Sequence, residues 1–162
     1  MSTATTAFEI DNTVRMPRAA AEGGLALDAT KLWTGGVATA VVSALISVVG
    51  VLVLRVIATH VPNLPLTAGL GTSQATVLLA TLAAIAALAA TGLAHLLLVS
   101  TPRPMAYLGW IVGLATAAAV VLPLTTGAVL AAAVAEGILN LVIGLAIGTL
   151  VTGAAYAATR VR

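Results

Sequence analysis

Residues 131–150 of the chain read AAAVAEGILNLVIGLAIGTL, and this stretch decides the fold class. It holds a single charged residue, Glu136, and only two other clearly polar ones, Asn140 and Thr149. An α-helix rises about 1.5 Å per residue, so these twenty residues span about 30 Å, the thickness of the hydrocarbon core of a bilayer. The stretch therefore predicts a transmembrane helix.

The rest of the chain has the same character. Hydrophobic residues make up 60% of it and charged residues 7%, too few charges to cover the surface of a water-soluble domain. Four apolar runs reach spanning length, and turn-forming segments such as Thr101-Pro102-Arg103-Pro104 separate them. We expect these spans at about 33–58, 77–99, 105–124 and 128–158. Because the connections are short, the spans should form an all-α, antiparallel four-helix transmembrane bundle.

The two ends of the chain differ from this membrane domain, which we place at residues 32–158. Residues 1–31 carry four of the five acidic residues, Pro17 and the Gly23-Gly24 pair, and show no sustained apolar period. We expect a disordered polar tail there. The first apolar run is too long for the core of a cleaved signal peptide, so it should stay in place as a membrane anchor. Residues 159–162 form a short basic end.

The positions of the basic residues predict the orientation. With four alternating spans, all of them except Arg55 fall on one side, which the positive-inside rule assigns to the cytoplasm. The residues on that side are Arg15, Arg18, Lys31, Arg103, Arg160 and Arg162. Four aromatic residues lie near the same side, as expected at a membrane interface: Trp33, Tyr107, Trp110 and Tyr156. We expect a multi-pass protein of the bacterial cytoplasmic membrane with both termini cytoplasmic.

Three residues are candidates for an intramembrane polar site. Glu136 and Asn140 are four residues apart and share a helix face, and Arg55 lies near the end of the first span, on the same side of the membrane as Glu136. An ionisable group in a spanning segment is costly, so it marks a function or a buried partner. Arg55 could pair with Glu136 or extend to the outer headgroups. Glu136 could also lie at the interface, where it needs no function.

Small residues predict where helices pack closely. Gly144 and Gly148 form a GxxxG pattern that continues the face of Glu136 and Asn140, and we favour packing within the bundle over a seam between two copies. The first span has its own small-residue face. Its members are Gly36, Ala40, Ser43, Ser47 and Gly50. The two faces predict that the first and fourth spans pack against each other.

His95 is a candidate proton-relay or pH-sensitive residue near the cytoplasmic end of the second span, and the alternative is a satisfied helix-end histidine. No set of His and carboxylate residues has the spacing of a metal site, and no catalytic triad or nucleotide-binding motif is present. The basic residues are too few to indicate nucleic acid binding. We therefore expect no enzymatic activity, no metal and no cofactor.

Several local features recur in one family. They are Leu54-Arg55, the Thr101-Pro102-Arg103-Pro104 loop, Leu122-Pro123-Leu124 and the polar break in the fourth span. With the layout of residues 32–158, the chain resembles a family of uncharacterised actinobacterial four-span integral membrane proteins that carry a domain of unknown function. That family often has a histidine where Asn140 stands here, so a proton or metal role of that position does not carry over. The resemblance implies the four-span fold.

Two functions fit these features. The first is an accessory or scaffolding component of a membrane complex, in contact with the lipid bilayer and with other subunits or a second copy of itself. The alternative is a small transporter or proton-coupled carrier that uses Glu136, Asn140 and Arg55. The first is favoured because one acid and one nearby arginine make a thin pathway, and no inverted repeat is evident.

Overall fold

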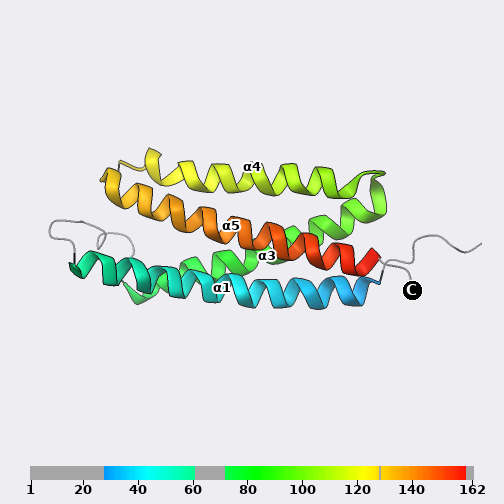
Figure 1. Ribbon diagram of the computed structural model, residues 1–162, viewed down its shortest axis with the longest axis horizontal. Helices are drawn as coiled ribbons and strands as arrows, with labels where there is room; N and C mark the ends of the chain where they lie inside the picture. The colour runs from blue at the N-terminus through cyan, green and yellow to red at the C-terminus, as the bar shows by residue number, and fades with distance from the viewer. Residues whose placement is uncertain (1–27, 61–71, 128, 160–162) are drawn as a thin grey trace, which may run out of the picture.

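A computed structural model describes residues 28–60, 72–127 and 129–159, which fold into four long α-helices (Figure 1). The helices are α1 (Ala29–His60), α3 (Ser73–Ser100), α4 (Pro104–Thr125) and α5 (Leu130–Thr159). All four are long and apolar enough to cross a membrane. The predicted all-α architecture with four candidate spans is therefore confirmed, and each helix boundary lies within four residues of the predicted one.

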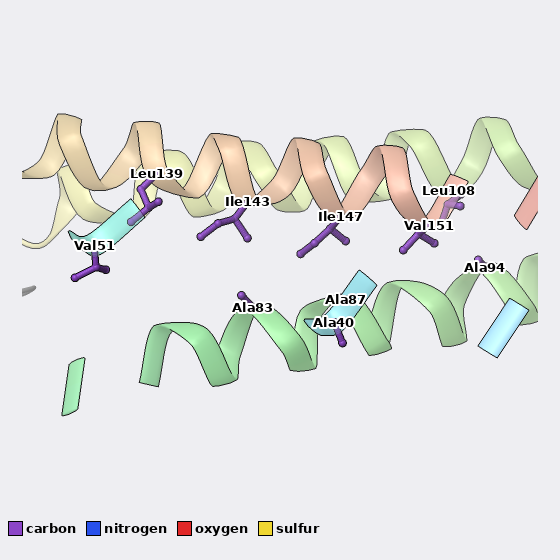
Figure 2. Packing of buried hydrophobic residues seen from close by; sticks show 10 residues of the cluster. All are labelled: Ala40, Val51, Ala83, Ala87, Ala94, Leu108, Leu139, Ile143, Ile147 and Val151. Carbon is purple, nitrogen blue, oxygen red and sulfur yellow. The ribbon is translucent and has the colours of Figure 1, made fainter. Parts of the chain in front are cut away.

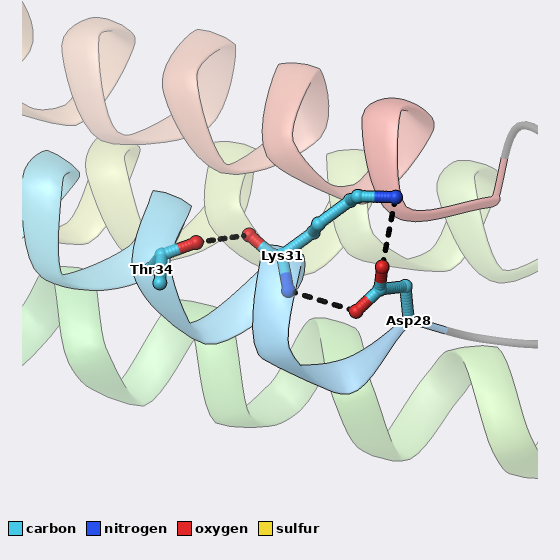
Figure 3. Close-up of polar contacts among 3 residues, drawn as sticks. All are labelled: Asp28, Lys31 and Thr34. Atoms are coloured by element: carbon cyan, nitrogen blue, oxygen red, sulfur yellow. Dashed lines mark hydrogen bonds and ion pairs between the residues drawn. The ribbon is translucent and has the colours of Figure 1, made fainter.

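The first helix begins earlier than predicted. Asp28 precedes α1, and its Oδ1 accepts the backbone N–H of Lys31 at 3.2 Å, while Oδ2 lies 2.8 Å from the Lys31 ammonium (Figure 3). This capping contact starts the helix at Ala29, so residues 29–31 do not belong to a disordered tail. The hydrogen bond from the Lys31 side chain, with that from its backbone, holds the pKa of the Asp28 carboxyl below its usual value. The remaining predicted ends, 1–27 and 160–162, lie outside the described residues.

Local residues also explain the other helix ends. Thr72 precedes α3, and its hydroxyl accepts the backbone N–H of Ala75 at 3.1 Å, as an N-cap does. Pro104 is the first residue of α4, where its missing N–H costs nothing. Gly127, just past the end of α4, has a φ of 73°, the left-handed conformation that ends many helices. These residues end one helix and start the next within a few positions. The connections between α3, α4 and α5 are therefore short, and successive helices run antiparallel.

All helix pairs except one are in contact in the described part of the chain, most extensively α1 with α3 and α4 with α5 (Figure 1). α1 packs along α3 and also along α5, and α5 packs along α4, whereas α1 and α4 are not neighbours in the described part of the chain. α3 crosses behind α5: it lies beside α1 at one end and reaches α4 at the other. The start of α1 meets the end of α5, where the Asp28 N–H donates to the Ala158 carbonyl at 3.3 Å. We name the two ends of the bundle the Asp28 end and the Arg55 end.

The core is built where α5 faces α3 and α1. Larger side chains of α5 point from its ribbon towards alanines of α3 (Figure 2). These residues are Leu139, Ile143, Ile147 and Val151 on α5 and Ala83, Ala87 and Ala94 on α3. Alanine lets two helix backbones approach closely, which is how helices associate in a membrane. Large apolar side chains cover the outside instead, with Trp110 and Val99 each 72% exposed, which suggests contact with lipid.

Candidate functional site

Asn140 links α5 to α4. Its side-chain Nδ2 donates a hydrogen bond of 2.9 Å to the backbone carbonyl of Ala119. In an α-helix that carbonyl would accept the N–H of residue 123, four positions later, but residue 123 is a proline and has no N–H. Asn140 therefore supplies from α5 the donor that Pro123 removes from α4. An unpaired carbonyl in an apolar surrounding is costly, so we assign Asn140 a structural role.

The small residues of α5 also face α4. A β-carbon added at Gly137 would lie 3.0 Å from the Val120 carbonyl oxygen, and one at Gly148 would lie 3.3 Å from a methyl group of Val112. At Gly144 an added β-carbon would collide with the Thr116 side chain. With the Asn140 hydrogen bond to Ala119, these contacts follow α4 one turn at a time. The predicted packing of the first span against the fourth is confirmed, because α1 packs along α5, but the GxxxG stripe itself packs against α4.

The small residues of α1 serve two neighbours. An added β-carbon at Gly36 would collide with Thr91 of α3, and one at Gly50 would collide with Leu139 of α5. Ser43 and Ser47 are fully buried. Ser47 donates its hydroxyl to the Ser43 carbonyl of its own helix at 2.8 Å, whereas the Ser43 hydroxyl has no hydrogen-bond partner among the described residues. The α1–α5 contact exists, but glycines of α1 rather than the GxxxG pattern of α5 allow it.

Arg55 ties α1 to the start of α3. Its Nη2 donates to the backbone carbonyl of Thr72 at 3.0 Å and to the Thr76 hydroxyl at 2.9 Å. Within residues 28–60, 72–127 and 129–159, Lys31 and Asp28 form an ion pair, and none joins Arg55 to Glu136. The guanidinium binds a helix start, and of the two alternatives left open for Arg55 the ion pair is not found among these residues, whereas extension to the outer headgroups stays a prediction. The sequence signal was present in Thr72 and Thr76, one turn apart, but their partner was not predictable.

Glu136 lies at the same level of the bundle as Arg55. It sits in the second turn of α5 and is partly exposed, and its carboxylate has no hydrogen bond or ion pair to any residue that the structure describes. Glu136 precedes Tyr156 by twenty residues, and Arg55 follows Trp33 by twenty-two. These separations correspond to about 30 and 33 Å along the helices. Both charges are therefore one hydrocarbon thickness away from the aromatic residues of the Asp28 end.

His95 lies near the Asp28 end of α3. Its Nδ1 atom is buried and has no hydrogen-bond partner among the described residues. The side of α3 that carries His95 is only partly internal, because Thr91 is buried whereas Thr81 and Leu88 are exposed. The buried face instead carries Ala83 and other alanines, whose small size suits the crossing with α5. His95 lies one turn after Thr91, and no described residue forms a hydrogen bond with its Nδ1 atom through which a proton could pass.

The polar residues predicted to form one site are thus distributed over the bundle. Asn140 binds α4, Arg55 binds α3, and Glu136 binds neither of them. No group of three His, Asp or Glu residues in the described ranges could hold a metal ion. Pro123, Gly137 and Thr76 are the residues that sequence reasoning missed. A signal for Pro123 was present in the sequence: a proline inside one span leaves a backbone carbonyl without its donor, and an asparagine in the next span can supply that donor.

The four apolar helices fit a multi-pass integral membrane protein. No protein-family model, curated protein or solved structure matches the chain. The resemblance to actinobacterial four-span membrane proteins therefore stays a prediction.

Proposed function

We propose that this protein is a non-enzymatic accessory or scaffolding component of a membrane complex in the bacterial cytoplasmic membrane. The observation that carries the proposal is that α4 contributes only two buried residues, Leu108 and Pro123, among its 22. The rest of α4 is apolar surface held to the bundle by α5 along its length and by α3 more briefly. Such a surface suits packing against a further transmembrane helix, and it also tolerates lipid. The actinobacterial family assignment is part of the same proposal.

Two contacts favour this function over a carrier. A carrier of the kind considered needs Glu136, Asn140 and Arg55 to line one polar path. The Asn140 amide is bound to the Ala119 carbonyl, and the Arg55 guanidinium is bound to Thr72 and Thr76. Each of these contacts joins two helices, so each stabilises the bundle in the way that buried polar groups do in membrane proteins.

We propose that both termini are cytoplasmic. The start of α1 and the end of α5 lie at the same end of the bundle, which supports termini on one side (Figure 1). Lys31 and Arg103 flank helices at this Asp28 end, where Trp33 and Tyr156 also lie exposed. Basic residues on the cytoplasmic side and aromatic residues at the interface are the usual pattern of membrane proteins.

A matched pair of cysteines tests the orientation. The chain contains no cysteine, and Ser73 and Ser100 are exposed residues at opposite ends of α3. In whole cells, a membrane-impermeant maleimide should label Ser73→Cys, whereas it should label Ser100→Cys only after the membrane is opened. The two variants share the same helix and the same change of one atom, so each controls for the other. The reverse pattern would place both termini outside.

Purification from the native membrane tests the proposed function. The tagged chain, extracted in mild detergent, should elute with a companion protein at a fixed molar ratio through a second column. We expect the ratio to persist when the tag is moved to the other terminus. A chain that elutes alone, or only with copies of itself, and that conducts ions when reconstituted in vesicles would instead establish the carrier.

A further inference from the structure

We propose that the Glu136 carboxylate binds a basic side chain, arginine or lysine, on a transmembrane helix of a partner subunit that docks beside α3 and α4 at the Arg55 end. This inference rests on the proposed function and gives the partner its chemistry.

The position follows from the direction of the α5 side chains. Ile143 and Ile147 point from α5 towards α3 (Figure 2). Glu136 precedes Ile143 by seven residues, about two helical turns, so it lies on the same side of α5. At the Arg55 end, where α5 begins, α3 lies beside α1 and away from the α4–α5 pair (Figure 1). Glu136 therefore faces a side of the bundle that, among the described helices, α3 closes near the middle but not at the Arg55 end.

The burial pattern of α4 agrees with this position. Leu108, which packs with the core, lies near the Asp28 end of the helix. Beyond it the next buried residue is Pro123, close to the α5 contact at Asn140. Among the described residues, the side of α4 towards α3 thus has little cover at the Arg55 end, and a further helix can approach Glu136 there without displacing the core.

The charge of the partner follows from the charges that are present. Glu136 is the only acidic residue within the four helices, because Asp28 precedes α1 and is paired with Lys31. A carboxylate near the hydrocarbon boundary is costly unless an opposite charge or water compensates it. Arg55, the cation at the same level, donates to α3. In a second copy of the chain, Arg55 would be bound to α3 in the same way. We therefore assign the positive charge opposite Glu136 to a basic residue of a different subunit.

A lipid headgroup is the competing source of positive charge. Both a headgroup amine and a basic side chain can approach from the side that α3 leaves open at this end. A basic residue on a packed helix is held at the level of the carboxylate, and an arginine there can form two parallel hydrogen bonds with it. We therefore assign the site to a protein partner.

The test compares how firmly the companion is held by the wild-type chain and by three variants. Glu136→Gln should lower the affinity for the companion by at least about tenfold, since breaking a desolvated charge pair costs more than 1.4 kcal/mol. Glu136→Asp keeps the charge and should retain part of the affinity. Asp28→Asn, which neutralises the carboxylate at the other end, should leave it unchanged. The thermal midpoint of each chain without its companion shows whether the variant folds.

A photo-crosslinking residue at Ala132, one turn before Glu136, reports the contact with the carboxylate intact. It should join the chain to a companion peptide that contains arginine or lysine. If the wild-type chain holds a companion but Glu136→Gln holds it equally well, or if Ala132 crosslinks only to lipid, the inference is wrong and the proposed function stands. If the wild-type chain has no companion, the proposed function itself fails.

Discussion

Replacing Gly144 with leucine should separate α4 from α5 and lower the free energy of unfolding by about 3 kcal/mol. A β-carbon at this position would lie 2.8 Å from Cβ of Thr116 and closer still to its Oγ1 and Cγ2 atoms. Thr116 cannot move aside easily, because its side chain is β-branched and its hydroxyl donates to the Val112 carbonyl at 2.8 Å. The two helix backbones must therefore move apart, and the Asn140 hydrogen bond one turn away should be lost with them.

Gly153→Leu is the matched control. Gly153 is on the same helix, and an added β-carbon there has no atom within 4 Å. The change brings the same gain in helix propensity and in hydrophobicity, so stability should stay equal or rise slightly. The measurement is the thermal midpoint of each purified chain in detergent, followed by size-exclusion fluorescence. Equal midpoints for the two variants would show that the α4–α5 contact at Gly144 does not hold the bundle together.

The number and positions of the helices were predictable because they depend on one property. A span needs about twenty apolar residues, and Pro or Gly with polar residues must follow it. The stretch around Glu136 met that condition in spite of its charge, and α5 covers Leu130–Thr159. The missed detail, the start of α1, came from the capping contact between Asp28 and Lys31, which reads as part of a polar tail.

Which helices face each other was not predictable in the same way. A helix that is apolar all round has no polar face to orient it, so only small residues mark the contacts. Gly144 and Gly148 could have faced α1 or α4, and small residues on α1 made the first choice attractive. The structure uses Gly36 and Gly50 of α1 for α3 and α5, and leaves the α5 stripe to α4. Shape complementarity, with Thr116 opposite Gly144, decides this, and it is not visible in one sequence.

Charge pairing was a weaker guide still. Arg55 and Glu136 lie at the same level of the bundle, as their separations from Trp33 and Tyr156 indicate, and an ion pair was one of two alternatives. Arg55 instead binds the Thr72 carbonyl and the Thr76 hydroxyl. Backbone carbonyls are acceptors at every residue, so a sequence does not show which one an arginine selects. The Glu136 carboxylate has no ion pair among the described residues, and the proposed partner contact depends on this.

The hydrogen bond between α5 and α4 allows the most specific prediction. Asn140→Leu keeps the approximate size of the side chain but leaves the Ala119 carbonyl without a donor, and we expect it to cost about 1–2 kcal/mol of stability. Pro123→Ala returns an N–H to residue 123, and that group can donate to Ala119 within α4. Unfolding titrations of the wild-type chain, both single variants and the double variant form a complete cycle.

The cycle separates a local repair from a general helix contact. If Asn140 replaces the donor that Pro123 removes, Asn140→Leu should cost at least about 1 kcal/mol less in the Pro123→Ala chain than in the wild-type chain, since the carbonyl then has its own partner. If Asn140 acts only by packing against α4, the cost should be the same in both chains. An equal cost would therefore refute the repair, and a smaller one would explain why an asparagine is held within an apolar span of α5.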